Sequence, residues 1–300
     1  MSGTRKNEIV VGVDGSQTSA AAALWAADEA HHRRAKLVVL YAYELYASGS
    51  KDGALPGTGP YEEAEMAAAT LVDEVVKQVH QRHRDLAVQV SIRHESAGTA
   101  LLSASDEALL TVVSSHGRSA RAEELIGSFA IHTAEHGRGP VAVLRGDTAT
   151  IDPAGPVVVG ADGSAVSDQA IDFAFESAQA RKAPLHVVHC RDDGPLRAFH
   201  RHTGHVIEST SLDEQLTDLT DALAARVERF ADVVVVPAVV RGKPELALRE
   251  YCSEQAASVL VVGARGISGL AGLLLGSTSR MLLAHADIPV VVVRPDGAAA

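Results

Sequence analysis

The fold is decided by a short segment that occurs twice: VVGVDGS at residues 10–16 and VVGADGS at residues 158–164. In each copy an apolar, mostly β-branched run stops at Asp-Gly-Ser, and an alanine-rich helical pattern follows. The segment therefore predicts a buried strand that turns directly into a helix. The second copy begins 148 residues after the first. A repeat of this length indicates a duplicated domain, because solenoid units recur every few tens of residues.

Each half is predicted to alternate strands with helices. In the first half, strands are expected at 8–13, 36–42, 86–92, 109–113 and 140–144, and helices at 17–32, 61–84, 99–108 and 127–136. In the second half, strands are expected at 156–161, 184–190, 232–240, 258–262 and 288–293, and helices at 165–181, 211–231, 244–256 and 277–285. This order is typical of an α/β fold with a parallel sheet covered on both faces. The expected domains are residues 1–148 and 155–296.

Composition narrows the class of protein. Hydrophobic residues make up 46% of the 300 residues and aromatic residues only 4%, so the cores are expected to be aliphatic. A formal net charge of −11 opposes general attraction to nucleic acid or to an anionic membrane. The two cysteines, Cys190 and Cys252, offer no disulfide framework. Without an apolar N-terminal or membrane-spanning stretch, the sequence predicts a soluble, cytoplasmic protein.

A glycine-spaced loop follows the fourth strand of each half. In the second half Gly263, Gly266 and Gly276-Ser277 lie between an apolar strand and a helix. Such a loop can gather backbone N–H groups around a phosphate, and the following helix start adds an electropositive end. Gly163 and Ser164 offer further donors after the first strand. The alternative is that these glycines only turn and cap a strand-to-helix connection.

The first half repeats this loop with one departure. Ser114-x2-Gly117-x9-Gly127-Ser128 carries a serine where the second half has Gly263. A side chain at that position disfavours positive φ and crowds a ligand, so we expect weaker binding in the first half.

Both halves resemble the universal stress protein family, and the whole chain is similar to its tandem members. The nucleotide-binding subgroup carries Gly-x2-Gly-x9-Gly-Ser/Thr, which residues 263–277 match without a gap. The resemblance also covers the two Asp-Gly-Ser segments and the closing segments 140–145 and 289–294. It implies two flavodoxin-like (Rossmann-like) domains, each with five strands in the order 3-2-1-4-5. It further implies pairing of the last strands between domains. Because bare edge strands tend to find partners and the segments 141–144 and 290–293 are apolar, we expect an internal pseudo-dimer of the two halves, and self-association as a homodimer.

The same resemblance implies ATP, with Mg²⁺, as the ligand of each half. Asp14 and Asp162 would lie near adenosine, although an aspartate before glycine also commonly makes a turn or caps a helix. The backbone at Ala42 and Cys190 would meet the adenine edge. The residues expected to hold ribose and phosphates are Gly15, Ser114, Gly117, Gly127 and Ser128 in the first half and Gly163, Gly263, Arg265, Gly266, Gly276 and Ser277 in the second.

The expected function is that of an ATP-binding stress-response protein whose nucleotide state regulates its shape or partners. Fast phosphoryl transfer needs a placed base and cationic charge, and the sequence indicates neither, so little or no turnover is expected. Two alternatives stay open: a slow ATPase or autophosphorylating enzyme, and a dimerisation module that binds no nucleotide. The His-x-x-Glu-His pattern at 132–136 is interpreted as a chance match to a zinc site, because the second copy lacks it.

Overall fold

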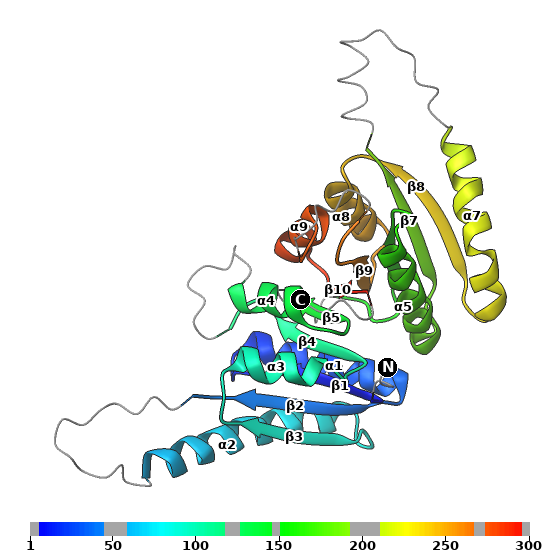
Figure 1. Ribbon diagram of the computed structural model, residues 1–300. Coiled ribbons are helices and arrows are strands. Elements are labelled where there is room, and N and C mark those ends of the chain that lie inside the picture. The colour runs from blue at the N-terminus through cyan, green and yellow to red at the C-terminus, as the bar shows by residue number, and fades with distance from the viewer. Residues whose placement is uncertain are drawn as a thin grey trace, which may run out of the picture. The chain divides into compact units, whose positions relative to one another are not determined.

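The computed structural model describes residues 6–44, 59–117, 127–145, 151–192, 211–266 and 274–295. The chain divides into two compact units, Met1–Leu144 and Arg145–Ala300 (Figure 1). Each unit is an α/β domain built around a parallel sheet, as the alternating pattern predicts.

The first unit contains the expected succession of elements. They are β1 (Glu8–Gly12), α1 (Gln17–Arg33), β2 (Lys36–Ala42), α2 (Gly59–Arg82), β3 (Val88–Arg93), α3 (Ala97–Ser105), β4 (Leu110–Ser114), α4 (Ser128–His136) and β5 (Val141–Leu144). The strands lie in the order β3-β2-β1-β4-β5 and all pairs are parallel. Helix α1 packs against α2, and α3 packs against α4, so each face of the sheet has its own helix pair.

The second unit repeats this arrangement. Its elements are β6 (Val157–Ala161), α5 (Ala165–Arg181), β7 (Leu185–Arg191), α7 (Leu212–Arg229), β8 (Val235–Arg241), α8 (Pro244–Glu254), β9 (Val259–Gly263), α9 (Ser277–His285) and β10 (Val290–Val293). The strands lie in the order β10-β9-β6-β7-β8, again all parallel. In both units the order reverses beside the first strand, which leaves a crevice at the carboxyl ends of the strands.

Aliphatic side chains fill the cores. Every residue of β5 and β10 is buried. The central strands β1, β4 and β9 are buried except at their ends, and β6 is buried except at Gly160. Near-continuous burial of valine and leucine is what a sheet covered on both faces requires. None of the described helices combines the length and the hydropathy that crossing a membrane requires.

The sheet of the second unit ends at β8, which begins later than the sequence pattern predicts. Residues 230–233 form a turn in which the Val233 N–H donates to the Phe230 carbonyl at 2.9 Å, so the strand starts at Val235. The Leu185 N–H donates to the Val234 carbonyl at 2.9 Å, which fixes the register of β8 on β7. Pro237 lies opposite Val187 in this register.

Among the helices whose starts the structure describes, four are capped by a serine. The hydroxyls of Ser16, Ser96, Ser164 and Ser211 accept an N–H from the first turns of α1, α3, α5 and α7. Helices α4 and α9 differ, because they begin at Gly127 and Gly276 and have no side-chain cap. Their first N–H groups are therefore left without the usual serine acceptor.

Candidate functional site

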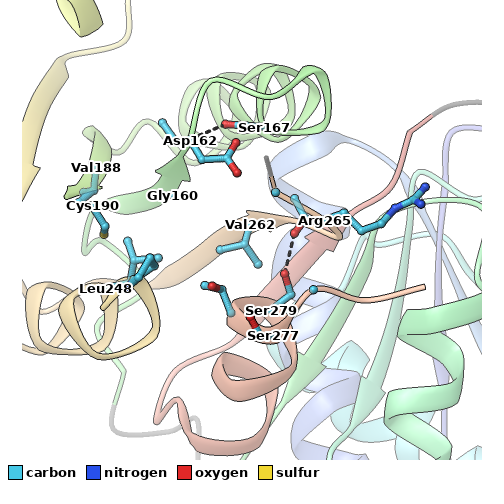
Figure 2. A pocket seen from close by; sticks show the side chains of 16 residues that line it. Gly160, Asp162, Ser167, Val188, Cys190, Leu248, Val262, Arg265, Ser277 and Ser279 are labelled. Atoms are coloured by element: carbon cyan, nitrogen blue, oxygen red, sulfur yellow. Dashed lines mark hydrogen bonds between the residues drawn. The ribbon is translucent and has the colours of Figure 1, made fainter. Parts of the chain in front are cut away.

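A hollow of about 410 Å³ opens at the carboxyl ends of β6, β7 and β9 in the second unit. This is the point at which the strand order reverses, and the volume falls in the range of small-molecule sites. Figure 2 shows side chains from the strands, from α8 and from the start of α9 facing this hollow. Seven residues that the sequence singles out line it: Asp162, Cys190, Gly263, Arg265, Gly266, Gly276 and Ser277.

The two oxygens of Asp162 face different partners. Oδ1 accepts the Ser164 N–H at 2.9 Å, which is the local turn that aspartate before glycine commonly makes. Oδ2 lies against the backbone of Gly266, where a Cβ atom would overlap it. In the first unit Asp14 repeats this arrangement, and a Cβ atom at Gly117 would lie 2.7 Å from Asp14 Oδ2. One oxygen of each aspartate therefore makes a local turn, and the other lies beside the loop glycine. A structural role in the turn and a role in ligand binding are compatible.

The loop glycines adopt no unusual backbone conformation, and all of them except Gly276 leave little room for a Cβ atom. Among the described glycines, positive φ occurs only at Gly15 (84°), Gly163 (79°) and Gly242 (138°). The expectation that Ser114 disfavours a positive φ is therefore wrong, because neither Ser114 nor its counterpart Gly263 adopts one. The expected crowding of a ligand stays a prediction. Within the protein, a Cβ atom at Gly263 would lie 3.1 Å from Cγ1 of Val166.

The start of α9 forms one wall of the hollow. The Gly276 N–H donates to the Ala264 carbonyl at 2.8 Å and so closes the loop onto the end of β9. The hydroxyl of Ser279, which is buried, donates to the Gly263 carbonyl at 2.7 Å. Ser277 and Thr278 line the hollow beside the uncapped first turn. This wall therefore combines hydroxyls with backbone N–H groups.

The opposite wall is apolar. Val188 and Cys190 of β7, Val262 of β9, and Pro244 and Leu248 of α8 contribute to it. Burial, aided by the charge of Glu245, raises the pKa of Cys190 to about 12, so this thiol is a neutral wall group at physiological pH. Pro244 and Leu248 are not predictable from the sequence, because only the packing of α8 on the sheet directs them into the hollow.

Charge in the hollow is sparse. Among the described residues that line it, Arg265 is the single cation and Asp162 the single carboxylate. Figure 2 shows the guanidinium of Arg265 extending away from the hollow. Gly163 is not among the lining residues, and nothing lies within 4 Å of the position of its Cβ atom.

The loop of the first unit is tied by its own hydroxyls. Ser114 Oγ and Thr18 Oγ1 both donate to the His116 carbonyl, at 2.9 and 2.8 Å. Ser115 Oγ also hydrogen-bonds to His116 Nδ1 at 2.8 Å. In the second unit the corresponding residues are Gly263, Val166, Ala264 and Arg265, which carry no hydroxyl. The two hydrogen bonds from Ser114 and Thr18 to the His116 carbonyl therefore have no counterpart in the second unit, where Gly263 and Val166 stand at these positions.

The other predicted site residues of the first unit lie at positions equivalent to those of the second unit. Gly127 approaches the loop closely, since a Cβ atom there would lie 2.9 Å from the Ser115 carbonyl oxygen. Ala42 ends β2, as Cys190 nearly ends β7. Ser128 opens α4, but its side chain lies outside what the structure describes.

Comparison with known proteins covers nearly the whole chain. The model of the universal stress protein family matches residues 7–145 and again residues 154–294. A universal stress protein of Mycobacterium tuberculosis is 35% identical over 98% of this chain and 99% of its own length. Another, from Mycolicibacterium smegmatis, is 33% identical over 96% of this chain and 97% of its own length.

The fold is also shared with a solved structure. The crystal structure of a universal stress protein from Archaeoglobus fulgidus superimposes with a TM-score of 0.71 at 20% identity, covering 97% of this chain and 99% of that one. The family model finds its domain in each of the two units described above. The chain therefore belongs to the universal stress protein family, as a member with two such domains in tandem.

Proposed function

We propose that the second unit binds an adenine nucleotide, with ATP and Mg²⁺ as the leading ligand, and that occupancy regulates the protein with little or no turnover. One observation carries this proposal: the hollow joins an uncapped helix start and a glycine loop on one side to an apolar wall on the other. Phosphate suits the first side and a purine ring the second.

Asp162 would bind the middle part of the nucleotide, between the phosphates on one side and the purine ring on the other. A carboxylate accepts hydrogen bonds from sugar hydroxyls and repels phosphate, so the ribose is the natural partner of Asp162. The phosphates would then lie toward Ser277 and Thr278. Arg265 is the single cation among the described lining residues, and its guanidinium extends away from the hollow (Figure 2). A polyphosphate would therefore depend on backbone N–H groups and on its own Mg²⁺ for charge compensation.

Gly276→Ala tests the proposal without breaking the fold. Gly276 lines the hollow with a φ of −69°, and a Cβ atom there would meet nothing closer than 3.6 Å, so alanine fits the protein. We expect ATP affinity, measured by isothermal titration calorimetry, to fall at least about tenfold, a loss of about 1.4 kcal/mol. Gly98→Ala, in α3 and with ordinary space around its Cβ position, is the matched control.

Two results would contradict the proposal. One is the absence of heat with ATP, ADP and AMP at millimolar concentration in the unaltered protein. The other is equal affinity of the Gly276→Ala and Gly98→Ala proteins. Steady release of phosphate that Gly276→Ala abolishes would instead favour the slow ATPase.

A further inference from the structure

A second hollow, of about 640 Å³, lies in the second unit at the amino ends of the strands. Its floor is made of small or compact apolar residues that are buried: Cys252, Ala257, Leu260 and Ala286. It is therefore at the opposite edge of the sheet from the candidate nucleotide site. Helix α8 contributes to both, through Leu248 to the first hollow and Cys252 to the second.

The internal repeat shows how the same corner is built in the first unit. There the connection from α4 to β5 contains two glycines and packs directly onto the end of α3. A Cβ atom at Gly139 would lie 3.2 Å from the Ser105 carbonyl oxygen, and Ser105 Oγ accepts the Arg138 N–H at 3.3 Å. Arg138 also pairs with Asp106 at 3.4 Å. A close backbone approach, a hydrogen bond to a serine side chain and an ion pair therefore hold this connection to the helix.

The second unit replaces each of these contacts. Ala286 and Ile288 stand where the first unit has its two glycines, and Asp287 stands between them in place of the arginine. Cys252 takes the position of the serine hydroxyl and is buried. Side chains at 286 and 288 prevent the close backbone approach that glycine permits. These substitutions lie at the corner where the second hollow opens, since Ala286, Asp287, Ile288 and Cys252 all line it.

The charged side chains at the rim of the hollow favour a positively charged ligand. Three carboxylates, those of Asp152, Glu250 and Asp287, surround it together with one cation, Arg249. Arg249 Nη2 lies 3.7 Å from Asp287 Oδ2, so part of the arginine's charge is already compensated. The whole chain carries a formal charge of −11, which adds to the same sign.

We propose that this hollow is a binding site for an amphiphilic cation, a compact apolar chain that ends in an ammonium group. The apolar part would occupy the space over Ala257 and Ala286, and the ammonium would lie among the rim carboxylates. This inference stands independently of nucleotide binding, because no residue of the glycine loop takes part. The rim carboxylates are exposed, with Asp287 at 90%, so charge is expected to set a preference of about tenfold and not an absolute selection.

The full-length protein can be titrated with n-octylammonium and with octanoate, which share the chain and differ in the sign of the head. Isothermal titration calorimetry at low ionic strength should detect octylammonium and find octanoate about tenfold weaker. Ala286→Leu fills the floor and should remove the binding of both. The double variant Glu250→Lys with Asp287→Lys should reverse the preference, whereas Asp221→Lys, on the exposed face of α7, should leave it unchanged.

Equal or tighter binding of octanoate by the unaltered protein would overturn the proposal, as would octylammonium binding that survives Ala286→Leu. If Ala286→Leu fails to fold, the charge-reversal variant decides the question, because its two positions are exposed. An unchanged preference in that variant would place the ligand elsewhere and would end the proposal.

Discussion

The carboxylate of Asp162 occupies the space in which residue 266 would carry a side chain, so the loop after β9 can lie against the end of β6 only because residue 266 is glycine. The same relationship joins Asp14 to Gly117 in the first unit. Two residues about a hundred positions apart in the sequence thus determine together the shape of each site. The spacing of these glycines is therefore explained in part by a contact within the protein itself.

Gly266→Ala should therefore move Asp162 even without ligand. The methyl group would displace the carboxylate and weaken its hydrogen bond to the Ser164 N–H, which is 2.9 Å long. We expect the free energy of unfolding, measured by urea denaturation, to fall by about 1–3 kcal/mol. Unfolding that matches the Gly98→Ala control would show that Asp162 does not constrain this loop.

The hydrogen bonds from Ser114 and Thr18 that hold the first-unit loop predict that the two units differ in ATP affinity. Replacing Ser114 by Gly and Thr18 by Val removes both hydroxyls that donate to the His116 carbonyl. The free energy of unfolding should fall by about 1–2 kcal/mol. Under the proposed function, the calorimetric stoichiometry for ATP should rise from about one toward two per chain, because the first unit would then resemble the second. Thr18→Val alone is the control, since Val166 shows that valine fits this position.

Gly263→Ser makes the opposite change in the second unit. The added Cβ atom would lie 3.1 Å from Val166 Cγ1, so the loop must shift by a few tenths of an ångström. ATP affinity should fall. Retention of full affinity in this protein, together with no gain in the first-unit double variant, would contradict the idea that position 114 or 263 controls binding.

Much of this architecture is predictable from the sequence, because the duplicated β-branched runs and their Asp-Gly-Ser ends are local patterns. Gly263, Gly266 and Gly276 were likewise predicted to shape one loop. The reason for those glycines was only partly predictable: positive φ is a local property and occurs at Gly163 instead, whereas the Asp162–Gly266 contact depends on how two strand ends meet. The inward orientation of Leu248 and the corner substitutions around Cys252 likewise depend on packing.

Ser279→Ala should show how α9 is held to the sheet. The Ser279 hydroxyl donates to the Gly263 carbonyl at 2.7 Å, and Ser279 is only 3% exposed. Removing this donor leaves the carbonyl without that partner, and the free energy of unfolding should fall by about 1–2 kcal/mol. Alanine is sterically acceptable, because Ala130 holds the same position in the first unit. Unchanged stability in thermal and urea unfolding would show that the bond contributes little.

The two cysteines predict a loss of stability in alkali. Burial raises the pKa of Cys190 and of Cys252 to about 12, above the value of about 8.5 expected in the unfolded chain. The unfolded state therefore releases protons first, and stability should fall as pH rises from about 9 toward 12. Urea denaturation at pH 8 and pH 10 measures this slope, which Cys190→Ala together with Cys252→Ala should reduce.

The same shift should make both thiols slow to alkylate, because the thiolate is the reactive form. The rate with iodoacetamide should rise about tenfold for each pH unit between pH 8 and 10. Bound ATP should protect Cys190, which lines the first hollow, and not Cys252. Fast labelling of Cys190 at pH 7 would contradict the burial of its thiol.

Helices α1 and α5 end at residues that glycine would suit better. Arg34 and Lys182 both adopt left-handed φ values, 51° and 55°. Lys182→Gly should therefore raise the free energy of unfolding, by up to about 1 kcal/mol. Lys182→Ala is the matched comparison, because it removes the charge and keeps the strained φ. A glycine protein no more stable than the alanine protein would show that this backbone costs nothing.

Pro237 should make the outer edge of β8 a poor partner for a further strand. The Leu185 N–H donates to the Val234 carbonyl, so the N–H and C=O groups of even-numbered β8 residues pair with β7. The backbone polar groups of residues 235, 237 and 239 therefore point away from β7. A missing N–H at residue 237 interrupts the outward row of donors in its middle, where an incoming strand would need it. This valine-rich edge strand is therefore a poor template for pairing with another chain. We expect little edge-to-edge association of the protein even at high concentration.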